Sequence, residues 1–259
     1  MSMSFRPQFD RSQIAAEIAT SSMRSSTGRR RRRGHAIRPA PNFFSRLRCK
    51  GSDAMKLEMY FDCSSPWSYL GFERILPLAE SFGITPELHP VLAGGIFNAV
   101  NPGIEYFKSK DSIPKRKVDY HAKVMQDWAD ITGVTIKFPP AGHPVNSVKA
   151  MRACLAVQPM GHLIPFARAC FQAIFRDELP LSEDAVLLDI CRELGLDGPW
   201  LLSRIAGQDM KDALRTKVDE AIARGAFGVP TIFLNDNDLY FGVDSLPLVA
   251  ARLEQSQAS

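Results

Sequence analysis

The sequence predicts an α/β fold in which a block of helices interrupts a small sheet. Strand and helix patterns alternate from residue 56, helical patterns fill the region from about residue 96 to 225, and strand patterns return near residue 228. The chain has 259 residues and 45% hydrophobic content, an ordinary globular composition. That length suffices for one large domain or two modest ones.

The first half of the predicted sheet surrounds one helix. Lys56–Asp62 alternates in polarity and contains Tyr and Phe, which is typical of a strand. A helix is expected from Pro66 to about Phe82, with a kink at Pro77. Ile84–Leu92 predicts a second strand, which Ala93-Gly94-Gly95 ends. The stretch Asn98–Pro114 is expected to be irregular, and a loop of that length usually has a function.

Helical periodicity then dominates. We expect helices over residues 115–132, 146–157, 161–176, 182–194, 199–205 and 209–224. Ser182 predicts a capped helix start, and Gly195 predicts a helix end.

The last segment predicts a hairpin and a final helix. Gly228–Leu234 and Leu239–Phe241 have strand patterns on either side of a polar turn, Asn235–Asp238. A helix is expected over Asp244–Glu254. The complete order is that of a thioredoxin-like fold with an inserted all-helical domain. We therefore expect one catalytic domain over 55–254, with a thioredoxin part at 55–95 and 226–254, a helical insertion at 96–225, and a tail at 255–259.

The first 54 residues differ from the rest in composition. They hold eleven arginines and one lysine against three acidic residues, a net charge of +9. Most of this segment lacks a periodic pattern of apolar residues, so we expect a disordered basic extension. Its Arg-rich, Ser-rich character resembles an organelle transit peptide, and a nucleic-acid-binding arm is an alternative. A third interpretation is that translation begins at Met55.

Composition excludes several function classes for residues 55–259. This part has 20 basic and 25 acidic residues, so neither nucleic acid nor a membrane is expected as a partner. The sequence has no run of 18 or more apolar residues, so no transmembrane helix is expected. The five cysteines form no Cys-x-x-Cys pair, and the five histidines are scattered, so no metal site is expected. Free thiols favour a reducing compartment, and we expect the cytoplasm, or an organelle if the extension is a transit peptide.

Ser65-Pro66-Trp67-Ser68 lies where a thioredoxin-like fold normally carries Cys-x-x-Cys. A helix N-terminus favours an anion, and a serine hydroxyl there can donate a hydrogen bond to a sulfur anion. The pattern indicates a thiol supplied from outside, as glutathione. The alternative is that Ser65 only caps the helix.

Val229-Pro230-Thr231 supports the first interpretation. A proline after an apolar residue, at the start of a late strand, is the expected place for a cis peptide bond. In this fold the preceding residue presents its backbone to a thiol-containing peptide.

The run from Phe61 to Gly71 resembles the opening of kappa-class glutathione transferases and 2-hydroxychromene-2-carboxylate isomerases. Both are glutathione-dependent relatives of DsbA-type disulfide oxidoreductases. The resemblance covers about residues 56–254 and implies the DsbA/kappa type of fold, glutathione as cofactor, a small aromatic substrate and a homodimer.

The resemblance also implies residue roles. Ser65 matches the serine that binds the glutathione sulfur, Val229 and Pro230 match the backbone contact, and Asp244 matches the acid that faces the γ-glutamyl amine. Ser245 stands where the family pattern has Arg. Lys117 matches the lysine near the glycine carboxylate, with Lys115 and Arg116 as rivals. The substrate-binding candidates are Asn101, Asn146, Arg152 and Trp67.

Four functions follow from these residues. The first is a glutathione-dependent isomerase acting on 2-hydroxychromene-2-carboxylate or a related intermediate of aromatic-compound catabolism. A kappa-class glutathione transferase is the alternative. A DsbA-type disulfide oxidoreductase is disfavoured because Ser65 and Ser68 replace both cysteines. A non-catalytic peptide-binding module is the fourth.

Overall fold

The computed structural model describes residues 55–103, 114–140 and 143–257. The expectations for residues 1–54, and most of those for the loop before Pro114, lie outside these ranges. Of the described helices, none has the length and apolar character needed to cross a membrane.

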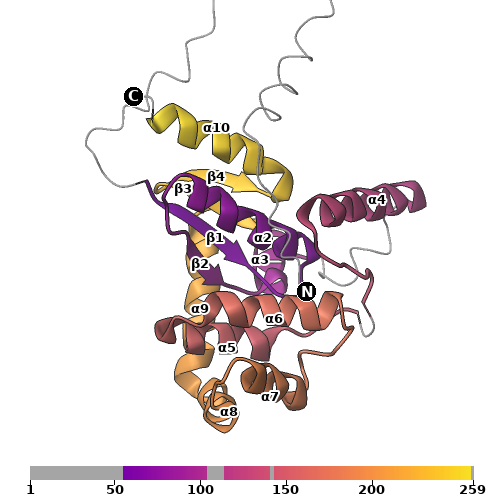
Figure 1. The fold of residues 1–259 in the computed structure, drawn as a ribbon, viewed down its shortest axis with the longest axis vertical. Coiled ribbons are helices and arrows are strands. Elements are labelled where there is room, and N and C mark those ends of the chain that lie inside the picture. The colour runs from indigo at the N-terminus through magenta and orange to yellow at the C-terminus, as the bar shows by residue number, and fades with distance from the viewer. Residues whose placement is uncertain (1–54, 104–113, 141–142, 258–259) are drawn as a thin grey trace, which may run out of the picture. The chain divides into compact units, whose positions relative to one another are not determined.

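A four-stranded mixed sheet forms the thioredoxin part (Figure 1). Its order is β2-β1-β3-β4, built from β1 (Leu57–Phe61), β2 (Glu87–Pro90), β3 (Thr231–Leu234) and β4 (Asp238–Phe241). Strand β1 pairs in parallel with β2 and antiparallel with β3, and β3 and β4 form the predicted hairpin. Because Tyr60 pairs with Thr231, the end of β1 lies beside the start of β3.

Helices account for most of the rest of the described chain (Figure 1). They are α2 (Pro66–Ser81), α3 (Ala93–Val100), α4 (Lys115–Thr132), α5 (Val148–Val157), α6 (Leu163–Phe175), α7 (Asp184–Glu193), α8 (Gly198–Ala206), α9 (Gln208–Ala223) and α10 (Leu246–Gln257). Two short 3-10 turns, η3 (Gln158–Met160) and η4 (Val243–Ser245), precede α6 and α10. The predicted thioredoxin-like fold with a helical insertion is confirmed.

Alternation along β1 buries both faces of the sheet. Leu57, Met59 and Phe61 belong to a core that continues into helices α5 to α8. Tyr60 points to a second, smaller cluster with Ile96 of α3 and Val218 of α9. The insertion therefore shares its core with the sheet.

Helix α3 was not predicted, and the expectation that Ala93-Gly94-Gly95 ends the strand without a helix was wrong. Ala93 and Ile96 are buried against α9, and a Cβ at Gly95 would lie 3.2 Å from Val218 Cγ1. The glycine that weakens the local helix signal thus allows two helices to approach closely. Helical structure thus begins at residue 93, before the expected start of the insertion at residue 96.

Three smaller expectations also need correction. Helix α10 extends to Gln257, so residues 255–257 of the expected tail are helical. Ser182 does not cap α7, whose N-cap position is occupied by Glu183. Asn146 precedes α5 instead of beginning it.

Candidate functional site

The junction between β1 and α2 is built around Ser65. Ser65 occupies the N-cap position of α2, and its Oγ accepts a hydrogen bond from Ser68 N at 3.1 Å. The Ser65 backbone N–H donates to the carbonyl oxygen of Asp62 at 3.0 Å. Pro66 follows at the first helical position, where a missing N–H leaves no bond unmade.

Ser65 is therefore a helix cap, which the alternative interpretation predicts. The capping bond does not use its hydroxyl hydrogen, so the O–H remains available as a hydrogen-bond donor. Its Oγ is the acceptor in the capping bond, so the O–H can point to a ligand. It lies at the N-terminus of a 16-residue helix, where the helix dipole favours negative charge. Capping and anion stabilisation are thus compatible in one side chain.

Ser68 has a structural role at the same junction. It is fully buried, and its Oγ accepts a hydrogen bond from the Asp62 backbone N–H at 3.4 Å. The second serine of the motif ties the first turn of α2 to the end of β1.

The Val229-Pro230 peptide is cis, which confirms the expectation from sequence. Pro230 lies against α2, because a Cβ at Gly71 would be 3.2 Å from Pro230 Cγ. Val229 and the Ser65 turn therefore meet at one end of the sheet, where β1 ends and β3 begins.

The Gly242–Ser245 turn is tied to the same loop. Gly242 N donates to the carbonyl oxygen of Pro230 at 3.0 Å, and Ser245 Oγ donates to the carbonyl oxygen of Gly242 at 2.7 Å. A Cβ on Gly242 would lie 2.6 Å from Asp244 Oδ1, so this exposed carboxylate folds back over the glycine. The turn η4 packs beside α2. Ser245, found where the family pattern has Arg, closes this turn.

The three basic candidates on α4 differ in their partners. Lys115 Nζ donates to both carboxylate oxygens of Asp119 at 2.8 Å. Within the described ranges, the side chains of Arg116 and Lys117 make no hydrogen bond or ion pair. Helix α4 packs against α2. Arg116 and Lys117 are thus the cations left for an anionic ligand.

The substrate-binding candidates occupy separate elements. Asn101 caps the C-terminus of α3, and its Nδ2 donates to Phe97 O at 2.9 Å. Asn146 is exposed, and its Oδ1 accepts from Val148 N at 3.1 Å. Trp67, in the first turn of α2, is half-buried and packs against the main core.

Arg152 has a distinctive environment. It is half-buried on α5, and its Nε is buried without a hydrogen-bond partner. No described acidic side chain pairs with its guanidinium. An unpaired, partly buried guanidinium is suited to bind a planar carboxylate through two parallel hydrogen bonds.

Asp62 has a structural role at this junction that the sequence analysis did not predict. Its side chain is 2% exposed, and its carboxylate accepts from Ser64 N at 2.9 Å and Ala93 N at 2.8 Å. The Ser147 side chain interacts with the same carboxylate. Burial raises the pKa of Asp62, although these bonds act to lower it. The sequence signal that could have indicated this role is an acidic residue directly after an apolar strand.

The described cysteines are buried and unpaired by disulfides. Cys63, Cys154 and Cys170 lie within hydrogen-bonding reach of one another beneath the junction. Burial raises the pKa of Cys63 and Cys170. It also opposes ionisation of Cys154, but interactions with Cys170 and Cys63 lower the pKa of that thiol. All three are 0% exposed, so none can attack a substrate from its present position.

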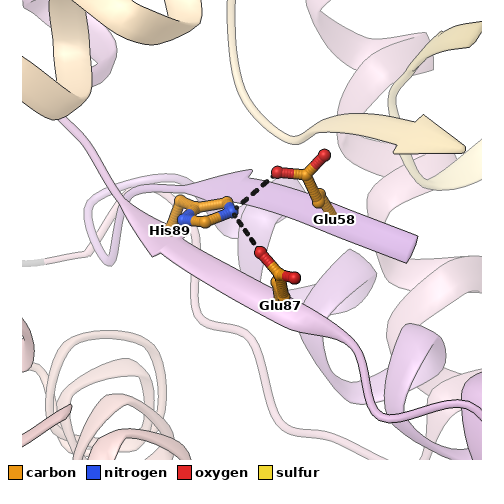
Figure 2. Close-up of side chains that lie close together, drawn as sticks. All are labelled: Glu58, Glu87 and His89. Atoms are coloured by element: carbon orange, nitrogen blue, oxygen red, sulfur yellow. Dashed lines mark hydrogen bonds and ion pairs between the residues drawn. The ribbon is translucent and has the colours of Figure 1, made fainter. Parts of the chain in front are cut away.

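Glu58, Glu87 and His89 form the one described cluster with the side-chain types of a metal site (Figure 2). His89 Nε2 lies 3.1 Å from Glu58 Oε1, and burial lowers the pKa of His89. Lys56 Nζ lies 3.2 Å from each carboxylate, and Arg224 binds both oxygens of Glu58 at 2.8–3.0 Å. Two cations thus already compensate the two carboxylates. We interpret this cluster as an ion-pair network.

Comparison with known proteins supplies the family. The model of the DsbA-like thioredoxin domain matches residues 56–254. The chain belongs to this DsbA-like family.

Curated relatives within the family carry two names. A 2-hydroxychromene-2-carboxylate isomerase from Pseudomonas putida is 25% identical over 193 residues, which cover 74% of this chain and 91% of the relative. A glutathione S-transferase kappa 1 from Rattus norvegicus is 28% identical over 207 residues, covering 75% and 88%. A solved structure of a 2-hydroxychromene-2-carboxylate isomerase superimposes with a TM-score of 0.68 at 24% identity and covers 77% of this chain and 94% of its own. That structure supports the fold.

Proposed function

We propose that this protein is a glutathione-dependent isomerase of 2-hydroxychromene-2-carboxylate or a related intermediate of aromatic-compound catabolism. The position of the Ser65 hydroxyl is the main support for this proposal. It caps α2 beside the cis Val229-Pro230 bond, and the junction has no exposed cysteine. The names of the Pseudomonas putida relative and of similar proteins support the reaction class.

The residues present fit glutathione, an anionic tripeptide with one amine. The Val229 backbone, at the start of β3, can pair with an extended cysteinyl unit. The exposed Asp244 carboxylate suits the γ-glutamyl ammonium group, and Lys117 or Arg116 suits the glycine carboxylate. When bound, glutathione would supply a nucleophilic thiolate, whose reversible addition to the substrate would allow rotation about a carbon–carbon bond.

Ser65 has two tasks in this reaction. Its O–H donates a hydrogen bond to the sulfur anion, and its Oγ keeps the first turn of α2 in place. The helix N-terminus adds favourable electrostatic interaction with the thiolate. Together they lower the pKa of the bound thiol relative to free thiol, which is about 8.5.

Arg152 is assigned to the substrate. A half-buried guanidinium without a described acidic partner binds the carboxylate of the aromatic substrate, while Asn101 and Asn146 contact its oxygens and Trp67 its ring. Both asparagines already make local hydrogen bonds, so they offer their remaining polar atoms.

A kappa-class glutathione transferase is the second candidate, favoured by the comparable identity to the Rattus norvegicus enzyme. It would use the same glutathione site but would keep the carbon–sulfur bond.

One assay separates the two. The purified protein is mixed with glutathione and 2-hydroxychromene-2-carboxylate, and both the isomeric product, trans-2-hydroxybenzylidenepyruvate, and free thiol are followed. The isomerase proposal expects product without loss of thiol. A stoichiometric loss of thiol with conjugate formation would establish the transferase, and absence of glutathione binding in calorimetry would remove both.

A further inference from the structure

The Asp62 carboxylate joins three segments that are distant in sequence. Its Oδ1 accepts from Ser64 N in the turn before α2, and its Oδ2 accepts from Ala93 N at the first residue of α3. The Ser147 side chain, at the N-cap position of α5, also interacts with this carboxylate and acts to lower its pKa. Each contact holds a group at the start of a helix or of a helix-forming turn.

One of these contacts replaces ordinary helix capping. Leu92, at the N-cap of α3, has no side chain that can cap, so Asp62 satisfies the Ala93 N–H. Ser147 makes no capping hydrogen bond to its own helix, and its side chain interacts with Asp62. A side chain at the end of β1 therefore holds the start of α3 and lies close to the start of α5.

The segments joined by Asp62 hold the two halves of the proposed site. The turn that it binds carries Ser65, whose N–H also donates to the Asp62 carbonyl. Helix α3 ends at Asn101, and Ser147 lies between Asn146 and the helix that carries Arg152. In contrast, the described hydrogen bonds of Pro230, Gly242 and Ser245 do not involve Asp62.

We propose that Asp62 is a positioning residue, which fixes the serine that holds the thiolate relative to the helices that hold the substrate. This inference rests on the proposed function and adds a residue to which no role was assigned. It predicts that substrate positioning can be lost without loss of glutathione binding. Loss of Asp62 displaces α3 and α5 from Ser65, while the elements assigned to the glutathione backbone stay in place.

The first test uses Asp62→Asn and Ser147→Ala, with Ser203→Ala on the exposed surface of α8 as a matched control. A misplacement of about 1 Å in an active site can lower the rate roughly 100-fold. We expect kcat to fall about 10- to 100-fold in Asp62→Asn and about 3- to 10-fold in Ser147→Ala, which removes only the interaction with α5. The Kd for glutathione, measured by calorimetry, should stay within about 3-fold of the wild type.

Two results would overturn the proposal. An unchanged kcat in both variants would show that Asp62 does not position the site. Loss of glutathione binding and of kcat in proportion to a fall in Tm would show a role in stability alone. Ser147→Ala keeps the test valid if Asp62→Asn does not fold, because it removes one hydroxyl.

Amide hydrogen exchange separates this proposal from the proposed function. Asp62→Asn should accelerate exchange at Ser64 and at the start of α3, and leave β3 unchanged. If the wild type catalyses neither reaction, the proposed function fails, and exchange alone decides whether Asp62 fixes these segments. Uniform acceleration, or none, would contradict it.

Discussion

Ser65 and Ser68 are joined by a hydrogen bond in which the Ser65 hydroxyl oxygen accepts from the Ser68 N–H at 3.1 Å. The two residues stand where a redox member of this fold would have its cysteine pair. The junction thus keeps the helix start and its cap and has no exposed thiol of its own. This relationship makes the two tasks of Ser65 separable by mutation.

Ser65→Ala should lose both tasks, whereas Ser65→Asp should lose one. Aspartate is as good an N-cap as serine, but its carboxylate cannot donate to a thiolate and repels it. We expect Ser65→Ala to lower stability by about 1 kcal/mol and both variants to lower kcat about 100-fold or more. Thermal unfolding and steady-state kinetics provide the two readouts. Retention of full activity in Ser65→Asp would rule out the donor role.

Arg152→Met should weaken binding of the carboxylate substrate selectively. A hydrogen bond to a charged group contributes about 1.5–3 kcal/mol, so the KM should rise roughly 10- to 100-fold. The Kd for glutathione should not change. Arg215→Met, on the exposed surface of α9, is the matched control. An equal rise in KM for both variants would mean that the effect is one of net charge.

Gly242→Ala should weaken glutathione binding. Gly242 has a φ of +83°, and an added Cβ would lie 2.6 Å from Asp244 Oδ1, so the carboxylate assigned to the ammonium group must move. Gly83→Ala is the control, because Gly83 has a φ of +69° and no heavy atom within 4 Å of an added Cβ. Both variants should lose about 1 kcal/mol of stability, and only Gly242→Ala should raise the Kd for glutathione. Equal Kd values would show that Asp244 does not contact the ligand.

Glu58→Gln should destabilise the fold at neutral pH. Burial acts to raise the pKa of Glu58, but hydrogen bonds from Arg224 and Lys56 lower it to about 2. Since the folded pKa lies below the unfolded value, the stabilising contribution is present above about pH 4.5 and is lost as the pH falls toward 2. Breaking such a buried pair costs about 3–5 kcal/mol. Denaturant unfolding at pH 7 and pH 3 should show a smaller difference between wild type and variant at pH 3. A difference that does not depend on pH would contradict the account.

The sequence predicts most of the fold because its strongest signals are local. The apolar alternation of β1, the proline at the start of α2 and the polar turn between β3 and β4 each depend on neighbouring residues. Helix α3 could not be predicted in this way, since its glycines and apolar residues gain from contact with α9, more than 100 residues further along the chain.

The site was predictable to a similar extent. The positions of Ser65 and the cis Val229-Pro230 bond follow from a short motif and from a proline at a strand start. The partners of Asp62 come from residues 93 and 147, so only the three-dimensional arrangement reveals its role. The function of Ser245 in closing the turn was likewise hidden, because the sequence showed only the absence of an arginine.

The pKa of the bound glutathione thiol tests the central claim most directly. It can be obtained from the ultraviolet absorbance of the thiolate as a function of pH, with wild type and Ser65→Ala each saturated with glutathione. We predict a pKa at least one unit below that of free thiol in the wild type, and a value close to that of free thiol in the variant. A bound thiol that titrates like the free tripeptide in the wild-type protein would contradict the account.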